Sequence, residues 1–274
     1  KTKFKNMQDM LKKYNFSFDT FYKLKKYCDT KKIEFMSTPF DLKSANFLNQ
    51  IGVKLFKISS GDIDNFYLLS QIKKFNKPII ISTGMSKNNE IIETINFLKL
   101  PRSKLAILHC ISDYPTELKN TFFSNINFLK KFKYDVGFSD HTIGELSSSI
   151  AISLGAQIIE KHITISQDMD GPDHACSLPI SELNNFVTNL KEIKKSVTKK
   201  RQLTNLEKET LKVARKSLYY SRDLKKGSVI KFKDLIPLRP AENNISPKKF
   251  KIYLGKKLKK NRKKYTSLRD TDFK

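Results

Sequence analysis

The sequence of 274 residues lacks several features that mark common classes of protein. Its cysteines, Cys28, Cys110 and Cys176, are odd in number and form no CxxC pair, which argues against a disulfide scaffold or a zinc ribbon and fits a reducing cytosol. No apolar run reaches the roughly 18 to 20 residues that a membrane-spanning helix needs, and no signal peptide is visible. We therefore predict a cytoplasmic protein without a membrane partner.

Acidic residues are scarce as well, since 53 Lys and Arg outnumber 27 Asp and Glu to give a formal net charge of +26. Such an excess can indicate a protein that binds nucleic acid. However, lysine greatly outnumbers arginine, and no RNP-like, zinc-finger or helix-turn-helix motif is present. Charge alone is weak evidence, so we interpret the lysines as a solvated surface that attracts small anions, and we do not expect a nucleic-acid partner.

A repeated unit is present instead: a short β-rich run, a polar residue at its C-terminal end, and an amphipathic helix. Near-continuous apolar strands that alternate with helices are typical of a parallel sheet covered by helices. The predicted strands cover residues 33–38, 53–60, 78–83, 105–110, 135–140 and 157–164. The predicted helices include residues 43–50, 65–75, 88–98, 144–154 and 181–197.

Six such units fit either an open doubly wound sheet or most of a (β/α)8 TIM barrel. No GxGxxG motif follows any strand, which disfavours a dinucleotide-binding sheet. Polar, cationic and metal-ligating side chains occupy the C-terminal ends of the predicted strands, where a barrel builds its active site. The sequence therefore favours an α/β barrel with a site at this rim.

His141 and His162 follow neighbouring predicted strands, so the fold would bring them close together. Imidazole nitrogens bind Mn, Fe, Co or Zn, and two of them leave positions open for water and substrate. The alternative is that each histidine forms a hydrogen bond inside the core. The matching positions favour a metal site, with Asp140 and Glu160 as candidates for orienting ligands or moving protons.

A second group of rim residues suggests an anion site. Hydroxyls together with a lysine commonly bind phosphate, and Lys57, Ser60, Ser82 and Ser139 lie at three strand ends. The serines could instead be helix N-caps, and Lys57 could be a Schiff-base nucleophile. Three more residues could either act in the site or serve only packing and turn structure, namely His109, Asp173 and His174.

The pattern changes near residue 200. We predict a partial TIM-barrel domain over residues 1–199, a linker with a short helix over 200–214, and a small, mostly β domain over 215–274. The last segment is too short for a large core of its own, so we expect it to dock on another surface.

Seven stretches between residues 33 and 178 resemble one family in order: FMSTPFD, FKISSGDI, KPIIISTGMS, LHCISDYPT, GFSDHTIG, GAQIIEKHIT and GPDHACSL. The family is that of the sialic acid (N-acetylneuraminate) synthases, with their legionaminic and pseudaminic acid relatives. KSLYYSRDLKKGSVI, LIPLRP and ISP resemble its C-terminal antifreeze-like (SAF) domain. The resemblance implies condensation of phosphoenolpyruvate with N-acetylmannosamine or a related N-acetylated hexose, giving a nonulosonic acid and phosphate.

The resemblance also implies roles for individual residues. His141 and His162 would hold a divalent metal, typically Mn²⁺, that polarises the sugar aldehyde. Tyr114 matches a sugar-side position. The residues that match phosphoenolpyruvate-binding positions are Lys57, Ser60, Ser82 and Ser139, and those that match positions contacting sugar and intermediate and moving protons are Glu160 and Asp173.

Arg239 matches an arginine that one subunit of a domain-swapped homodimer delivers into the barrel of its mate, to meet the N-acetyl group. The chain departs from the family in two ways: the first two barrel strands are apparently missing, which suggests N-terminal truncation, and RPAENNIS lacks the glycines usual after the arginine and proline.

Two other functions are left open. One is a Schiff-base pyruvate aldolase that uses Lys57, and the other is an inactive fragment that acts as a basic binding protein.

Overall fold

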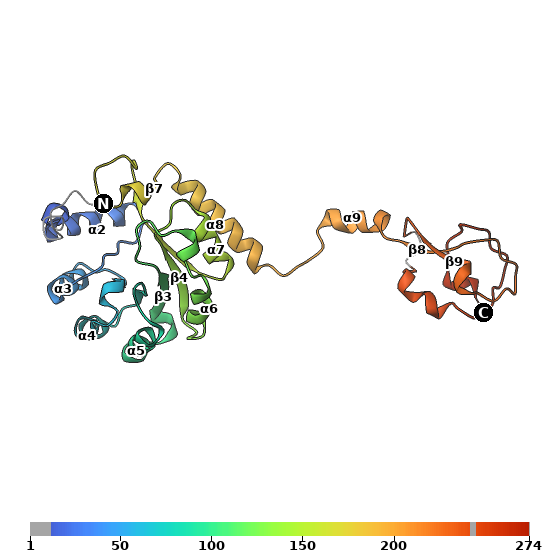
Figure 1. The fold of residues 1–274 in the computed structure, drawn as a ribbon, viewed down its shortest axis with the longest axis horizontal. Helices are drawn as coiled ribbons and strands as arrows, with labels where there is room; N and C mark the ends of the chain where they lie inside the picture. The colour runs from blue at the N-terminus through green and yellow to red at the C-terminus, as the bar shows by residue number, and fades with distance from the viewer. Residues whose placement is uncertain (1–11, 242–244, 274) are drawn as a thin grey trace. The chain divides into compact units, whose positions relative to one another are not determined.

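The computed structural model describes residues 12–241 and 245–273 and divides into two units, Lys1–Lys199 and Lys200–Lys274. Figure 1 labels the elements of both units. No helix among the described residues combines the length and the apolar character that crossing a bilayer requires.

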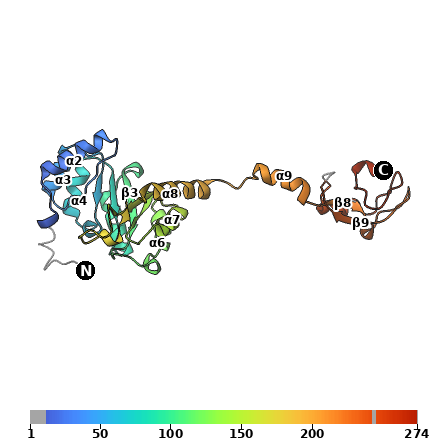
Figure 2. The same cartoon turned by 90° about the horizontal axis from the view of Figure 1, so that it is seen from above.

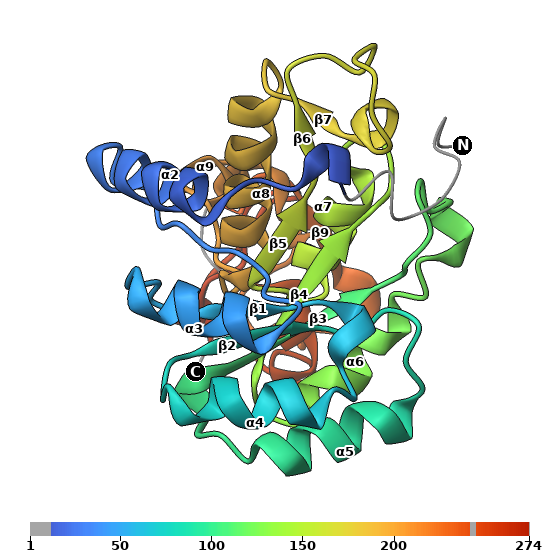
Figure 3. The same ribbon diagram turned by 90° about the vertical axis from the view of Figure 1, so that its left-hand side faces the viewer.

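The first unit is built on a five-stranded parallel sheet whose strands follow one another in chain order. These strands are β1 (Phe56–Ile58), β2 (Ile79–Ser82), β3 (Leu105–Cys110), β4 (Asp135–Asp140) and β5 (Ile158–Lys161). After β5 the chain forms a separate, short parallel pair of strands, β6 (Ile163–Thr164) and β7 (Leu178–Pro179). The sheet curls (Figure 3), so the described part of this unit forms a half-barrel.

Helices connect the strands and cover the outer side of the sheet. They are α2 (Phe18–Thr30), α3 (Leu42–Gln50), α4 (Phe66–Lys74), α5 (Asn88–Leu98), α6 (Ser124–Lys130), α7 (Leu146–Ser153) and α8 (Leu183–Thr198). Figures 1 and 2 show α2, α3 and α4 following one another along one flank. Local signals begin several of them; the carboxylate of Asp41, for example, accepts the backbone N–H of Ser44 at 2.7 Å as the N-cap of α3.

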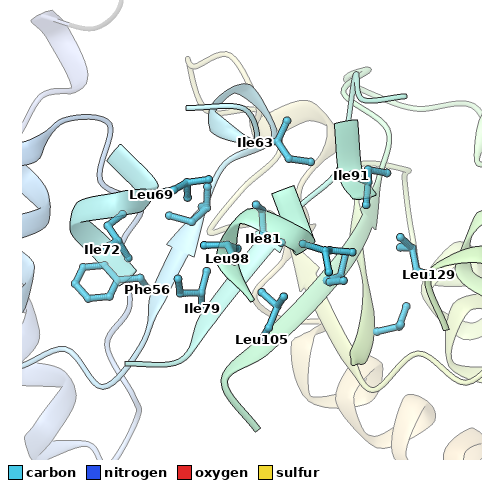
Figure 4. Close-up of a cluster of buried hydrophobic side chains, with 14 of the residues drawn as sticks. Phe56, Ile63, Leu69, Ile72, Ile79, Ile81, Ile91, Leu98, Leu105 and Leu129 are labelled. Atoms are coloured by element: carbon cyan, nitrogen blue, oxygen red, sulfur yellow. The ribbon is translucent and has the colours of Figure 1, made fainter. Parts of the chain in front are cut away.

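Side chains alternate along each strand between the outer, helix-covered face of the sheet and its inner face. Side chains of one parity pack against the helices and form the apolar core (Figure 4), as Phe56, Ile79 and Leu105 do. Because successive side chains of a strand point to opposite faces, the residues between them face the interior of the curl. The register pairs Lys57 with Ile80 and Ser139 with Glu160, which keeps each parity in one row across the sheet.

The prediction of a strand at residues 33–38 is wrong, because residues 33–39 form no regular structure. A strand needs a hydrogen-bonded neighbour, and β1 is bonded only to β2 in the sheet order. The backbone N–H of Ile33 bonds instead to the carbonyl of Cys28, near the end of α2.

Other strands differ in extent. The run predicted at residues 53–60 is a strand only over Phe56–Ile58, the run at 157–164 is divided into β5 and β6, and β7 was not predicted. Closure into an eight-stranded barrel, and the two missing strands, stay predictions.

The second unit contains α9 (Asn205–Ala214), which lies within the predicted linker, and an antiparallel pair, β8 (Ser217–Tyr220) and β9 (Leu235–Leu238). Its small core gathers Leu218, Tyr220, Leu258, Leu268 and Phe273 with their neighbours. Beyond this pair of strands, the described chain is joined by isolated antiparallel bridges, one of which links Tyr219 of β8 to Ser267. Whether this unit is an SAF domain stays a prediction.

Residues 222–235 and 260–273 of this unit are two copies of one structural motif. Leu224 and Arg262 exchange backbone hydrogen bonds, both of 2.8 Å. Each copy ends in a 3-10 turn capped by a buried aspartate: Asp234 accepts the N–H of Lys231 at 2.9 Å, and Asp272 accepts that of Arg269 at 3.0 Å. Corresponding contacts therefore repeat along the chain and stabilise a unit that has little regular sheet.

Candidate active site

A cavity of about 380 Å³ opens at the C-terminal ends of β1 to β5. Its position follows from the alternation of the strands, because the residues of the inner row just before each strand end carry polar side chains. The lining residues are Lys57, Ser59, Ser60, Gly61, Ser82, Met85, Cys110, Ser112, Tyr114, Ser139, His141, Glu160 and His162. All the residues predicted for phosphoenolpyruvate and for the metal are in this group.

A hydrogen-bonded network crosses the floor of the cavity. The ammonium of Lys57 donates to the hydroxyl of Ser82 at 2.7 Å and lies 3.5 Å from the carboxylate of Glu160. Ser139 donates to the other carboxylate oxygen of Glu160 at 2.6 Å. Lys57, Ser82 and Ser139 are buried, whereas the side chain of Glu160 is 35% exposed. Four strands therefore contribute to one network of charged and hydroxyl groups.

Ser60 is held at the cavity by a close approach of backbone. The N–H of Gly84 donates to the hydroxyl of Ser60 at 2.9 Å. A Cβ atom at position 84 would lie 2.3 Å from Oγ of Ser112 and 2.9 Å from Oγ of Ser60. Only glycine fits there, and its absence of a side chain lets the loops after β1, β2 and β3 converge on the cavity.

His141 and His162 lie beside each other at the ends of β4 and β5, with ring centroids 5.4 Å apart. Nδ1 of His141 donates to the carbonyl of Ile111 at 2.7 Å, so Nε2 is the nitrogen left for a ligand. The ring of Tyr114 lies 4.1 Å from that of His141 and 5.8 Å from that of His162. The carboxylate of Asp173 approaches Nδ1 of His162 at 3.7 Å.

Burial and neighbouring charges shift the pKa values of these groups. Burial lowers the pKa of His162, which favours a neutral imidazole. Burial also opposes protonation of His141, but the Cys110 thiol, the Ile111 carbonyl and the charge of Glu160 outweigh it and raise the pKa. Burial, with the nearby Cys110, Asp173 and Glu160, raises the pKa of Tyr114 to about 12, which keeps its hydroxyl protonated.

A second cavity, of about 420 Å³, shares His162 with the first. Tyr14, Ile163, Pro172, Asp173, His174 and Ser177 complete its lining. The backbone carbonyl of Asp173 accepts the Ser177 hydroxyl at 2.7 Å, and Nδ1 of His174 lies 2.8 Å from the hydroxyl of Thr164. These contacts shape the loop and leave the carboxylate of Asp173 directed toward His162.

His109, which the sequence left open, and Asp140, a candidate for orienting ligands or moving protons, lie outside the cavities. His109 belongs to the helix-facing row: its Nε2 donates to the carbonyl of Thr121 at 2.6 Å, and Nδ1 accepts from Asn125 at 3.2 Å. It is therefore a packed core residue. Asp140 also faces away from the cavity and pairs with Lys161.

Arg239 belongs to the second unit, directly after β9. Its role toward the site stays a prediction.

The structure adds site residues that the sequence reasoning did not select. Cys110 and Ser112 line the cavity from the end of β3 and the loop after it, and Met85 lines it from the loop after β2. The rule that strand ends build the site could have identified Cys110 and Ser112.

The histidine pair fits a divalent metal by its chemistry. Among the described residues no group of three or more His, Cys, Asp and Glu side chains is arranged to hold an ion. The two imidazoles would thus be the protein ligands, with the remaining positions open to water or substrate. The carbonyl of Ile111 orients His141 as an outer partner of such a ligand commonly does.

Comparisons with known proteins decide the family. The NeuB family profile matches residues 1–202. The chain belongs to the NeuB family. The N,N'-diacetyllegionaminic acid synthase of Campylobacter jejuni is 41% identical over 243 residues, which cover 87% of this chain and 72% of the relative. The synthase of the same name from Legionella pneumophila is 34% identical over 267 residues, which cover 95% of this chain and 75% of the relative.

A solved structure agrees with this assignment. The crystal structure of the N-acetylneuraminic acid (sialic acid) synthetase from Leptospira borgpetersenii, in complex with citrate, matches with a TM-score of 0.70 at 33% identity, covering 76% of this chain and 74% of that one. The resemblance to sialic acid synthases inferred from the sequence is confirmed.

Proposed function

We propose that this NeuB-family protein condenses phosphoenolpyruvate with the open-chain form of an N-acetylated hexose, giving a nonulosonic acid and inorganic phosphate. The observation that carries the proposal is one cavity in which the Lys57–Ser82–Glu160–Ser139 network adjoins the pair of His141 and His162. An anion anchor beside two metal-ligating imidazoles suits a reaction between an anionic enol phosphate and an aldehyde.

The anion anchor would hold phosphoenolpyruvate. The ammonium of Lys57 and the hydroxyls of Ser60, Ser82 and Ser139 can donate to phosphate and carboxylate oxygens, and charge-assisted hydrogen bonds of this kind are strong. Burial of Lys57 strengthens them further by excluding water. Substrate oxygens would replace the present bond from Lys57 to Ser82.

The reaction balances without an oxidant or reductant. The methylene carbon of phosphoenolpyruvate forms a bond to the aldehyde carbon, and the aldehyde oxygen gains a proton. Water adds to the enol carbon and loses a proton, and the bond from that carbon to the phosphate oxygen then breaks, releasing phosphate and a 2-keto acid. Glu160 can move the proton of the water. On the sugar side, the carboxylate of Asp173 can accept hydrogen bonds or protons, and the protonated Tyr114 can donate a hydrogen bond.

His141 and His162 would hold the divalent metal, for which we propose Mn²⁺, and the ion when bound supplies Lewis acidity at the aldehyde oxygen. The imidazoles themselves set where the aldehyde end of the sugar lies. The second cavity, which shares His162, would receive the rest of the sugar.

The acceptor follows in part from the names of the relatives. A product with two N-acetyl groups must obtain both from the sugar, because phosphoenolpyruvate contains no nitrogen. We therefore propose a hexose with two acetamido groups as the preferred acceptor and N-acetylmannosamine as a weaker one. We further propose that the chain acts as a domain-swapped homodimer in which the partner subunit's Arg239 meets the N-acetyl group.

The test is phosphate release from phosphoenolpyruvate by the purified chain with Mn²⁺, with and without N-acetylmannosamine and a diacetamido hexose. We expect release that depends on the sugar, is abolished by a chelator, and is lost in His141→Ala. The aldolase hypothesis predicts instead a pyruvate adduct on Lys57 that borohydride traps and a chelator does not affect. Trapping of that adduct without phosphate release would overturn the proposal.

A further inference from the structure

The ends of β4 and β5 bring three successive pairs of residues side by side. Ser139 pairs with Glu160 and Asp140 with Lys161 in the register, and His141 and His162 come next along the two strands. The first and third pairs face the cavity. The middle pair faces the other way because side chains alternate, so it lies directly behind the two pairs that carry the chemistry.

Asp140 and Lys161 form an ion pair of 3.0 Å between side chains that are almost fully buried, 0% and 5% exposed respectively. The carboxylate of Asp140 accepts four hydrogen bonds. One oxygen accepts the N–H and the hydroxyl of Thr142, both at 2.8 Å. The other accepts Lys161 and, at 2.6 Å, the hydroxyl of Ser148 on α7. We call these four residues, Asp140, Thr142, Ser148 and Lys161, the Asp140–Lys161 brace.

The brace holds the chain on both sides of His141. Asp140 precedes this histidine and binds the N–H of Thr142, which follows it. Lys161 also donates to the carbonyl of Thr142 at 2.6 Å, and Lys161 is the residue before His162. The backbone segment that carries one histidine is therefore tied to the residue that precedes the other.

We infer that the Asp140–Lys161 brace is a positioning device that fixes the spacing and orientation of His141 and His162 for a shared metal ion. This inference rests on the proposed function. None of the four residues lines either cavity, so they act through the histidines and not on the substrate. A buried ion pair that only stabilised the fold would have no need to enclose the backbone on both sides of His141.

The first variants compare Thr142→Val with Thr142→Ser. Valine is close to threonine in shape and removes one of the four bonds to Asp140, whereas serine keeps the hydroxyl. The readout is Mn²⁺ alone, titrated into the full chain and followed by electron paramagnetic resonance, which reports both affinity and the geometry around the ion. We expect Thr142→Val to weaken Mn²⁺ binding several-fold with an altered spectrum, and Thr142→Ser to match the wild-type chain.

Lys161→Met is the stronger variant. Loss of a group that hydrogen-bonds a metal ligand directly commonly lowers metal affinity by about 10-fold to 100-fold. Lys161 acts through Asp140 and the carbonyl of Thr142, so we expect a loss near the lower end of this range. Thr94→Val is the matched control, because Thr94 is also buried in the first unit and donates to the carbonyl of Ile63 at 2.7 Å, away from the cavities. It should lower thermal stability without changing Mn²⁺ affinity.

The outcomes separate this inference from the proposed function. If the wild-type chain binds no Mn²⁺, or binds it equally well after His141→Ala, the metal site itself fails. If the wild-type chain binds Mn²⁺ through His141 while Thr142→Val and Lys161→Met bind it equally well, the brace only stabilises the fold and the positioning inference is overturned. Should Lys161→Met fail to fold, the Thr142 pair decides alone.

Discussion

Both units bury polar side chains, but for different reasons. In the first unit Lys57, Ser82 and Ser139 are buried around a cavity and bind one another across strands that are far apart in the sequence. In the second unit Asp234 and Asp272 are fully buried, and each accepts the N–H of the residue three positions before it. Each also accepts a side-chain donor of the same unit, Arg222 and Tyr220 respectively. Stabilising a turn explains why a capping aspartate is buried. Polar groups that gather around an open cavity have no such role in the fold, so their burial indicates a ligand site.

Substitutions should therefore affect binding in the first unit and stability in the second. Removing a cavity group exposes no apolar core and breaks no turn, so the fold should survive while binding suffers. Removing a capping aspartate leaves backbone N–H groups without partners, so the second unit should loosen. Three predictions test this contrast.

The largest expected effect is on activity. Lys57→Met keeps the length of the side chain and removes its charge, so phosphoenolpyruvate loses an ammonium donor in a buried site. We expect kcat/KM for phosphoenolpyruvate to fall by about 10²-fold to 10³-fold, as for loss of one preorganised donor. Steady-state phosphate release at varied phosphoenolpyruvate, beside a thermal melt, measures this.

Lys104→Met is the matched control. Lys104 lies just before β3, at the end of the sheet opposite the cavity, where it donates to the carbonyl and side chain of Asn76 at 2.8 and 2.6 Å. It should leave kcat/KM unchanged. Equal loss of activity in the two variants would mean that Lys57 acts through general surface charge rather than in the cavity.

The second effect is on the stability of the second unit. Asp234→Ala removes a carboxylate that accepts Arg222 at 2.7 Å and the N–H of Lys231 at 2.9 Å. Since hydrogen bonds to a charged group contribute about 1.5–3 kcal/mol, we expect the unit to lose about 2–3 kcal/mol. Hydrogen exchange of peptides from residues 200–274 measures this.

Peptides from residues 12–199 serve as the internal control for Asp234→Ala, and their protection should stay unchanged. Protection lost equally in both units would show that the two do not unfold independently and would break the contrast.

Much of the first unit could be predicted from its sequence, because alternating apolar strands and amphipathic helices are local patterns. The predicted helix at residues 88–98 coincides with α5, and His141 and His162 do meet at neighbouring strand ends. Family resemblance then assigned the roles. The strand predicted at residues 33–38 failed because a strand depends on its neighbour, which a local pattern does not reveal.

The second unit was harder to predict. Its turns are held by pairs such as Lys226 N–H with Asn261 and Lys264 N–H with Asp223, both at 2.7 Å, which join residues far apart in the sequence. The two copies of its motif share few identical residues, so the repeat becomes visible only through these corresponding contacts. His109 shows the same limit: strand parity, not residue type, makes it a core residue rather than a catalytic one.

The smallest expected effect is a difference in pH dependence between the units. Burial lowers the pKa of His109 below its usual 6.5, so between that value and the folded pKa the unfolded chain binds a proton that the folded chain does not. The free energy of unfolding of the first unit should therefore fall as the pH falls below 6.5. In the second unit, Arg222 and the Lys231 N–H outweigh burial and lower the pKa of Asp234, so its contribution is lost only below pH 3.8.

His109→Gln isolates this effect, because glutamine can donate to the carbonyl of Thr121 but does not titrate. His162 has a lowered pKa and His141 a raised one, so only the difference between the wild-type chain and the variant reports on His109. We expect hydrogen exchange of residues 12–199 to accelerate less between pH 7 and pH 5 in the variant, after correction for the intrinsic rate, and residues 200–274 to respond alike in both chains. Equal acceleration of the first unit in the two chains would place the near-neutral pH dependence on the site histidines instead, and the contrast between a buried core histidine and the cavity groups would have to be abandoned.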